Sequence, residues 1–147
     1  IKAFSHIEGV KILDNAVVGP FARLRPGTVI GPNSHVGNFV EIKKTHIQKN
    51  SKVNHLSYLG DSNIGENVNI GAGVITCNYD GSKKNKTTIE DNVFVGSNVS
   101  LVAPIKLSKS SLVGAGSVIT QSVKKNALAV ERNEQKTFPN YKKNRKK

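Results

Sequence analysis

Residues 53–81 hold most of the side chains in this sequence that could carry out chemistry. His55 is the first candidate, because an imidazole titrates near neutral pH and can act as a general base. Cys77, the only cysteine, could act as a nucleophile in acyl transfer, although a small thiol that fills a corner of the fold is the simpler interpretation. A lone histidine is more often structural than catalytic, so the role of His55 depends on which residues the fold places beside it.

The elements that position these residues follow a repeat of six. Aliphatic residues recur at Ile12, Val18, Leu24, Ile30, Val36, Ile42, Ile47, Val53, Leu59, Ile64 and Ile70, and again at Ile89, Val95, Leu101, Leu107, Val113 and Ile119. Small or β-branched residues precede most of them by two positions, and glycine often follows. A period of six fits neither an α-helix nor a free amphipathic strand, but it fits a short strand followed by a tight turn supplied by Gly or Pro. Three such strands make one coil, and stacked coils predict an all-β fold, a parallel β-helix.

Stacking converts sequence spacing into proximity, because neighbouring coils lie about 4.8 Å apart. Arg25 and Lys43 both follow an aliphatic position and lie one coil apart in this pattern. Two adjacent cations repel each other unless an anion lies between them, so the pair indicates a phosphate-binding site. Two separate solvated cations are the alternative that the spacing leaves open. Glu41 and Tyr58 are expected to stack in the same way, one position earlier.

The same spacing predicts a column of small residues above His55. Ala72 lies one coil further along the chain, and Ser97 and Ala115 continue the column if the break in the repeat adds seven residues to one hexapeptide. Small side chains leave room for a long, thin ligand that could lie along this edge and bond to backbone amides. The column therefore favours a functional role for His55.

The repeat is interrupted at residues 77–88 and stops after Val123. We expect a β-helix domain over residues 1–123, with an excursion loop at about 77–88, and a basic tail over 124–147. The tail has nine Lys/Arg and two Glu, which is typical of a solvated segment; an anchor for a phosphate-rich ligand is the alternative. No nucleic-acid-binding motif accompanies the charge, so no nucleic-acid partner is expected. Because the chain starts without Met and its first coil is irregular, we expect an upstream segment to be missing.

Several classes of protein are excluded by what the sequence does not contain. No apolar run is long enough to cross a membrane and there is no signal peptide, so neither membrane insertion nor secretion is expected. One cysteine fits a reducing compartment, and a cytoplasmic protein is predicted. His6, His35 and His46 share no ligand spacing with His55, so no metal site is expected.

Four motifs make the sequence similar to a known family. They are F-A-R-L-R-P-G at 21–27, H-V-G-N-F-V-E-I-K at 35–43, N-H-L-S-Y-L-G-D at 54–61 and N-I-G-A-G-V-I-T-C-N-Y-D-G at 69–81. From about Val10 to Arg132 the chain resembles the C-terminal acetyltransferase domain of the bifunctional bacterial GlmU family. The resemblance implies a left-handed β-helix, a homotrimer with active sites between subunits, and acetyl transfer from acetyl-CoA to glucosamine-1-phosphate. The product would serve UDP-N-acetylglucosamine, peptidoglycan and lipopolysaccharide synthesis. The uridyltransferase domain that lies upstream in this family has no counterpart in the sequence.

The resemblance also implies roles for single residues. His55 matches the general base, and Glu41 is placed to orient its imidazole. Arg25 and Lys43 match sugar-phosphate ligands, and Tyr58 and Asn69 match sugar-binding residues. Lys84 matches another ligand of the sugar-nucleotide product and is expected to reach a neighbouring subunit. Acetyl-CoA contacts are matched by Ala72, Asn78, Tyr79, Ser97, Ala115 and Arg132. A backbone amide near Gly71 to Gly73 is expected to stabilise the oxyanion of the tetrahedral intermediate.

Two other functions remain open on the sequence. A hexapeptide acyltransferase could use a different amino sugar or a hydroxyl acceptor. A non-catalytic β-helix scaffold could serve for trimerisation and bind an anionic partner through its basic tail. His55, the Arg25–Lys43 pair and the excursion favour the enzyme, because a scaffold needs none of them.

Overall fold

The computed structural model describes residues 1–141 and builds this range from twenty short β-strands in three parallel sheets, here called A, B and C. Sheet A contains β1 (His6–Ile7), β4 (Arg23–Leu24), β7 (Glu41–Lys43), β10 (Tyr58–Gly60), β13 (Ile75–Cys77), β16 (Ser100–Val102) and β19 (Val118–Ile119). Sheet B contains β2 (Val10–Ile12), β5 (Thr28–Ile30), β8 (His46–Ile47), β11 (Ser62–Ile64), β14 (Thr87–Ile89) and β17 (Ile105–Leu107). Sheet C contains β3 (Val17–Val18), β6 (His35–Asn38), β9 (Lys52–His55), β12 (Asn69–Ile70), β15 (Phe94–Val95), β18 (Leu112–Val113) and β20 (Leu128–Ala129). Within this range no helix is long and apolar enough to cross a membrane.

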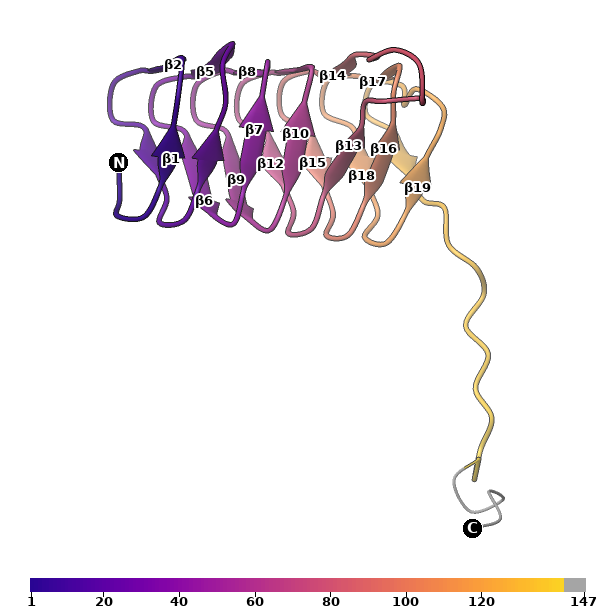
Figure 1. Ribbon diagram of the computed structural model, residues 1–147. Helices are drawn as coiled ribbons and strands as arrows, with labels where there is room; N and C mark the ends of the chain where they lie inside the picture. The colour runs from indigo at the N-terminus through magenta and orange to yellow at the C-terminus, as the bar shows by residue number, and fades with distance from the viewer. Residues whose placement is uncertain (142–147) are drawn as a thin grey trace.

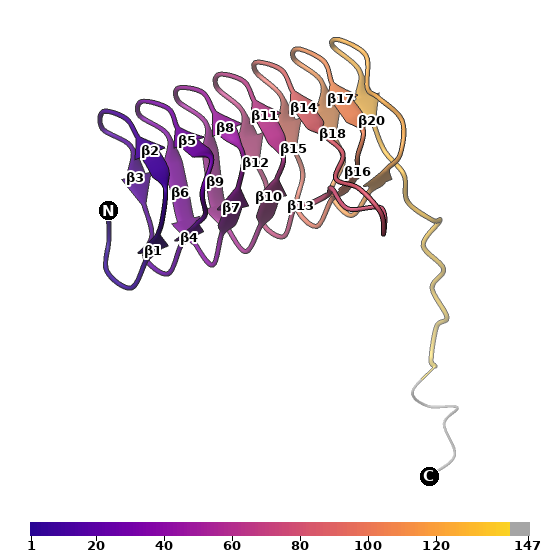
Figure 2. The same cartoon turned by 45° about the horizontal axis from the view of Figure 1, so that its top comes forward.

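The chain passes through the three sheets in turn and then begins the next coil. Each strand pairs in parallel with strands of the same sheet in the adjacent coils. The coils are stacked side by side, with the N-terminus at one end of the stack and β19 and β20 at the other (Figures 1 and 2). The predicted parallel β-helix with three strands per coil is confirmed.

The register of the sheets follows the spacing of the hexapeptides. Leu24 is the partner of Ile42, which is one full coil of three hexapeptides further along the chain. Glu41 is the partner of Tyr58, across a coil that contains one of the shorter steps of the repeat. Ile70 pairs with Val95 across the interruption. The excursion therefore adds seven residues to one coil, which is the length that the small-residue column above His55 requires.

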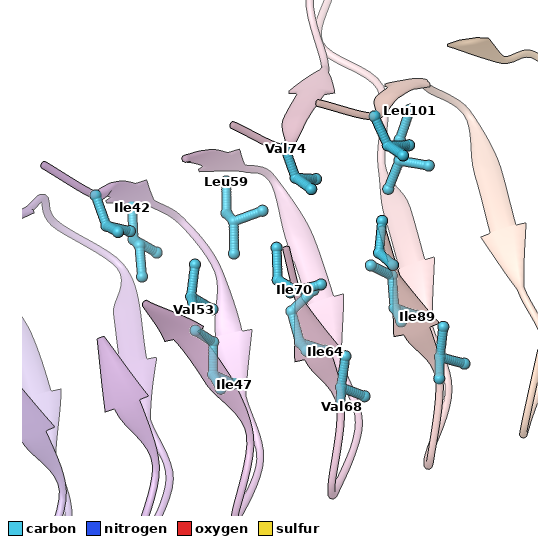
Figure 3. Packing of buried hydrophobic residues seen from close by; sticks show 14 of the residues in the cluster. Ile42, Ile47, Val53, Leu59, Ile64, Val68, Ile70, Val74, Ile89 and Leu101 are labelled. Carbon is cyan, nitrogen blue, oxygen red and sulfur yellow. The ribbon is translucent and has the colours of Figure 1, made fainter. Parts of the chain in front are cut away.

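The core is a row of aliphatic side chains that point into the coil from all three sheets (Figure 3). Ile42, Val53 and Leu59 have no exposed surface, although they come from strands of different sheets. Each coil has only a narrow interior, so its aliphatic residues pack mainly on those of the coils above and below. Ile12 lies near the N-terminal end of the stack and is only half-buried, because fewer coils cover it.

Glycine has a different role here from the one expected. Of the eight glycines that directly follow an aliphatic position of the repeat, only Gly19 has a positive φ. A Cβ on Gly31 would lie 2.6 Å from the backbone carbon of Gln48, and one on Gly37 would lie 1.9 Å from the carbonyl oxygen of Asn54. These glycines are required because adjacent coils approach closely. The left-handed conformation at one row of corners is adopted mainly by asparagine, which tolerates it better than most residues; this row contains Asn15, Asn33, Asn50, Asn67, Asn92, Ser110 and Asn126.

The excursion is shorter than expected. Cys77 belongs to β13 and Thr87 to β14, because each pairs with a neighbouring coil. The loop between them folds back on itself through an antiparallel bridge between Tyr79 and Lys84. Asp80 accepts hydrogen bonds from the amides of Lys83 and Ser82, at 2.8 and 2.9 Å, and these bonds help to lower the pKa of its carboxyl group.

The β-helix extends beyond the boundary expected at Val123. Leu112 and Gly114 donate backbone hydrogen bonds to the carbonyls of Ala127 and Ala129, both at 2.9 Å, so β20 completes a further strand of sheet C. The hexapeptide pattern is hard to recognise there because the strand has only two residues and Leu128 is exposed. After this strand the chain leaves the stack as an extended segment (Figure 1). The end of the predicted basic tail, 142–147, lies outside the described residues.

We expect Thr87→Val to stabilise the protein by about 1 kcal/mol. Thr87 is fully buried, and its hydroxyl has no hydrogen-bond partner among the described residues. Folding therefore removes the hydrogen bonds of this hydroxyl to water, and no hydrogen bond in the protein replaces them. Thr45→Val is the matched control. The Thr45 hydroxyl is equally buried but accepts from the amide of Ser62 at 3.2 Å and lies 2.9 Å from the Lys43 carbonyl oxygen, so its loss should destabilise. Urea midpoints at one protein concentration measure both effects, and a lower midpoint for Thr87→Val would contradict the prediction.

Candidate active site

His55 lies at the end of β9, at the corner where the chain leaves sheet C for sheet A. Its side chain is exposed, and its Nδ1 lies 3.2 Å from Oδ1 of Asn38. Asn38 ends β6 and is the register partner of His55 one coil earlier. The fold therefore pairs the candidate base with an amide that the sequence interpretation did not include. The sequence could have indicated Asn38, because the separation between Asn38 and His55 equals the length of one coil that contains a short step of the repeat.

Glu41 does not contact the imidazole in this chain. Its carboxylate accepts a hydrogen bond from Nη1 of Arg25 at 3.0 Å, and Nη1 of Arg23 lies 3.7 Å from the same oxygen. Glu41 is on β7 of sheet A, whereas the His55 side chain bonds to Asn38 of sheet C. The expected contact between Glu41 and His55 is thus replaced by an ion pair with Arg25.

The small-residue column above His55 is present. The amide of Asn98 donates to the carbonyl of Ala72 at 2.7 Å, and the amide of Gly116 donates to the carbonyl of Ser97 at 2.8 Å, so the corners stack directly. Ala72 is half-buried and Ser97 and Ala115 are exposed, and these short side chains leave an open edge. At the far end, Cδ of Arg132 lies 4.0 Å from the position that a Cβ on Gly116 would occupy. The column predicted from the sequence is confirmed.

Three cations converge near the end of the sheet A strands. Arg25 directly follows β4, and its amide donates to the carbonyl of Ile42 at 2.8 Å, which places it one coil from Lys43 of β7, as predicted. Lys84 comes from the excursion of the same chain, and its ammonium lies against that of Lys43. This contact is the main reason that the pKa of Lys43 is lowered, while burial and the charge of Arg25 act in the same direction and Asp61 opposes them. Cations held this close together form a site suited to an anion with several oxygens, such as a phosphate group.

A hydrogen-bond network anchors the excursion to sheet A. Nδ2 of Asn78 lies 2.6 Å from Oδ2 of Asp61 and 3.3 Å from the hydroxyl of Tyr58. The Asn78 side chain is almost entirely buried, so its amide holds Tyr58 and the loop in place within this chain. Asp61 was not among the residues selected from the sequence. Its position after β10 becomes informative only once the fold brings it to Asn78 and Lys43.

Of the selected residues, Asn69 lies away from this cluster, whereas the backbone of Tyr79 pairs with that of Lys84. Asn69 begins β12 on sheet C, where its register partners are Lys52 and Phe94. Tyr79 is exposed in the excursion, and its hydroxyl donates to the carbonyl of Gly81 at 2.7 Å. A single chain therefore brings together Arg25, Lys43 and Lys84 but does not place Asn69 with them.

A groove of about 300 Å³ lies on sheet C on the N-terminal side of His55. Its lining includes Lys2, Gly19, His35, Gly37, Asn38 and Asn54. The groove and the small-residue column lie on opposite sides of the imidazole along the stack. Among residues 1–141, no three His, Cys, Asp or Glu side chains are close enough to hold a metal ion.

The fold and the site define the class of this protein, which is a hexapeptide-repeat β-helix. The family model of the GMPPB C-terminal domain matches residues 6–82, and that of the hexapeptide repeat of succinyl-transferase matches residues 86–121. The bifunctional protein GlmU of Marinobacter nauticus is 53% identical over 99% of this chain, and that of Thermosipho melanesiensis is 60% identical over 89%. The chain belongs to the family of the GMPPB C-terminal domain, whose model matches more than half of it. It spans 32% and 29% of the length of these two relatives.

Solved structures share the fold at low sequence identity. PerB from Caulobacter crescentus, in complex with CoA and GDP-perosamine, superposes with a TM-score of 0.69 and 18% identity over 78% of this chain and 55% of that chain. A mutant of the N-acyltransferase AntD from Bacillus cereus, in complex with dTDP-4-amino-4,6-dideoxyglucose and coenzyme A, gives 0.68 and 18% over 87% of this chain and 79% of that chain. At this level of identity the likeness shows a common fold and no more.

Proposed function

We propose that this chain transfers the acetyl group of acetyl-CoA to the amine of glucosamine-1-phosphate, giving N-acetylglucosamine-1-phosphate. The observation that carries the proposal is the identity of 53% and 60% to GlmU proteins over most of the chain. The geometry supports it, because a candidate base, an anion site and an open edge for a long ligand are all present. None of these features is needed by a β-helix that serves only as a scaffold.

In this mechanism the sugar phosphate is held by Arg25, Lys43 and Lys84, and the amine is directed toward His55. The imidazole accepts a proton from the amine as the amine nitrogen attacks the thioester carbonyl carbon. The C–S bond then breaks, the amide product forms, and the thiolate of CoA receives the proton from the imidazolium. Holding both substrates in one orientation supplies much of the rate enhancement, because a bimolecular reaction becomes effectively unimolecular.

The backbone above His55 supplies the candidate oxyanion donor. The amide of Gly71 donates to the carbonyl of Val95 at 2.8 Å, and that of Gly73 donates to the carbonyl of His55 at 3.3 Å. The amide of Ala72, between them, is the one of the three that we assign to the oxyanion of the tetrahedral intermediate. This refines the broader expectation of a donor somewhere between Gly71 and Gly73.

Acetyl-CoA would lie along the small-residue column, with its thioester at His55. The short side chains of Ala72, Ser97 and Ala115 leave room for the pantetheine arm, and Arg132 provides a cation at the far end. Asn78 and Tyr79 complete the set of proposed contacts. The burial of Asn78 favours an indirect role, in which it positions the excursion.

We further propose that the chain acts as a homotrimer in the cytoplasm, as part of a longer protein with an upstream uridyltransferase domain. Exposed apolar side chains flank the column on both sides, Phe94 and Leu112 on sheet C and Ile75 and Val118 on sheet A. A neighbouring subunit would cover this surface. It would also bring a second set of residues, including its own Asn69, toward the site.

The proposal predicts release of the CoA thiol from acetyl-CoA in the presence of glucosamine-1-phosphate. The measurement uses a thiol reagent with the purified chain, and mass spectrometry identifies the N-acetylated product. Glucosamine without the phosphate should react with a KM at least about tenfold higher, because charge-assisted hydrogen bonds to phosphate are lost. Turnover with another amino sugar but not with glucosamine-1-phosphate would assign a different acceptor. A folded trimer without any acetyl transfer would support a scaffold instead.

A further inference from the structure

The hydrogen bond between His55 and Asn38 is fixed by the backbone on both sides. Asn38 and His55 are register partners in β6 and β9, and the amide of Leu56 donates to the carbonyl of Asn38 at 3.1 Å. Gly37 allows these two coils to approach closely, since any Cβ there would collide with the carbonyl oxygen of Asn54. The Asn38 side chain therefore meets the imidazole because of the fold, and its Oδ1 lies 3.2 Å from Nδ1.

The chemistry of this pair determines which ring nitrogen carries the proton. An amide oxygen can only accept a hydrogen bond, so this contact is a hydrogen bond only when Nδ1 is the protonated nitrogen of the neutral ring. Nε2 then keeps its lone pair and can act as the base. In solution a histidine prefers the opposite tautomer only weakly, so a single well-placed acceptor is enough to select one form.

The surroundings give Asn38 no competitor for this role. Among the described residues, Asn38 provides the only side-chain hydrogen bond to the imidazole. Glu41, the nearest carboxylate expected from the sequence, is paired with Arg25 at 3.0 Å. The other charged or titratable groups that line the adjoining groove are Lys2 and His35. Asn38 is therefore a neutral partner that places no charge beside the ring.

We propose that Asn38 is a positioning residue that holds His55 in the Nδ1-protonated tautomer and directs Nε2 toward the acceptor amine. This inference rests on the proposed acetyltransferase function for its kinetic consequence. The tautomer itself can be measured without any substrate. Asn38 acts through His55 and touches neither reactant.

The first test is the tautomer of His55, read from long-range ¹H–¹⁵N spectra of protein labelled with [¹⁵N]histidine and assigned with His55→Gln. The wild type should show a pyrrole-like Nδ1 and a pyridine-like Nε2. Asn38→Leu should shift the ring toward a mixture of tautomers. Asn63→Leu is the matched control, because Asn63 is an exposed register partner of His46 on sheet B. An unchanged His55 spectrum in folded Asn38→Leu overturns the proposal.

The second test is kinetic. Asn38→Leu should lower kcat about tenfold or more, with little change in KM for either substrate. Asn38→Asp keeps an acceptor at Nδ1 but adds a negative charge that favours the imidazolium, so the acid limb of kcat/KM should move to higher pH. Activity of this variant should recover at alkaline pH, which a purely structural role for Asn38 does not predict.

The outcomes separate this inference from the proposed function. If the wild type does not transfer acetyl groups, the function fails, and the tautomer spectra still decide the role of Asn38. If the wild type is active and both Asn38 variants keep its pH profile and kcat, the inference fails alone. If Asn38→Leu does not fold, the isosteric Asn38→Asp decides, and an unshifted acid limb overturns the proposal.

Discussion

Replacing His55 by alanine is expected to reduce turnover of acetyl-CoA with glucosamine-1-phosphate by at least about a hundredfold. The amine is largely protonated at neutral pH, so it must lose a proton before its nitrogen can attack the thioester carbon, and the nitrogen loses a second proton as the amide forms. His55 is exposed at the foot of the small-residue column, with Asn38 as its partner. Removal of the ring leaves this edge without a base, whereas the substrate-binding residues stay in place.

The measurement compares thiol release by the wild type, His55→Ala and His46→Ala. His46 is the matched control, because it is an exposed histidine at the same level of the stack but lies on sheet B. His46→Ala should keep wild-type turnover, and sizing should show that the variants keep the oligomeric state of the wild type. Equal activity of His55→Ala and the wild type would leave the acetyltransferase in place and remove His55 as its base.

The second large effect is expected from the double substitution Arg25→Gln with Lys43→Gln. Each charge-assisted hydrogen bond to the phosphate contributes about 1.5–3 kcal/mol, so the KM for glucosamine-1-phosphate should rise roughly a hundredfold or more. The KM for glucosamine, which lacks the phosphate, should change little. Lys106→Gln is the control, because Lys106 pairs with Glu90 on sheet B at 2.6 Å, away from the site. A similar rise for both acceptors would show that the two cations do not bind the phosphate.

The cation cluster also predicts how acceptor affinity depends on pH. The Lys84 ammonium, together with burial, lowers the pKa of Lys43, so Lys43 loses its proton at a lower pH than an ordinary lysine. The KM for glucosamine-1-phosphate should therefore begin to rise at a correspondingly lower pH. Lys84→Met removes the main cause of the shift and should move this rise to higher pH, although it also removes one phosphate ligand. A rise that stays at the same pH in Lys84→Met would contradict the assignment.

The sequence determined the architecture because the hexapeptide pattern is a local, repeated constraint. Each aliphatic position can be buried only if its strand points inward, and the length of one coil follows from three such strands. The same spacing placed Arg25 beside Lys43 and aligned Ala72 with His55, since a parallel stack converts one coil of sequence into one step along the axis. The end of the β-helix was missed, because the two-residue strand β20 carries little of the pattern.

The hydrogen-bond partners were decided by the tertiary structure alone. Side chains at one corner can turn toward either of two sheets, and the repeat does not say which. In the folded chain Glu41 pairs with Arg25, and His55 pairs with Asn38. The excursion also folds back, so that Lys84 lies beside Lys43 of the same chain. The period of the sequence thus determined which residues share a level and a column, whereas the direction of each side chain followed from close packing between coils.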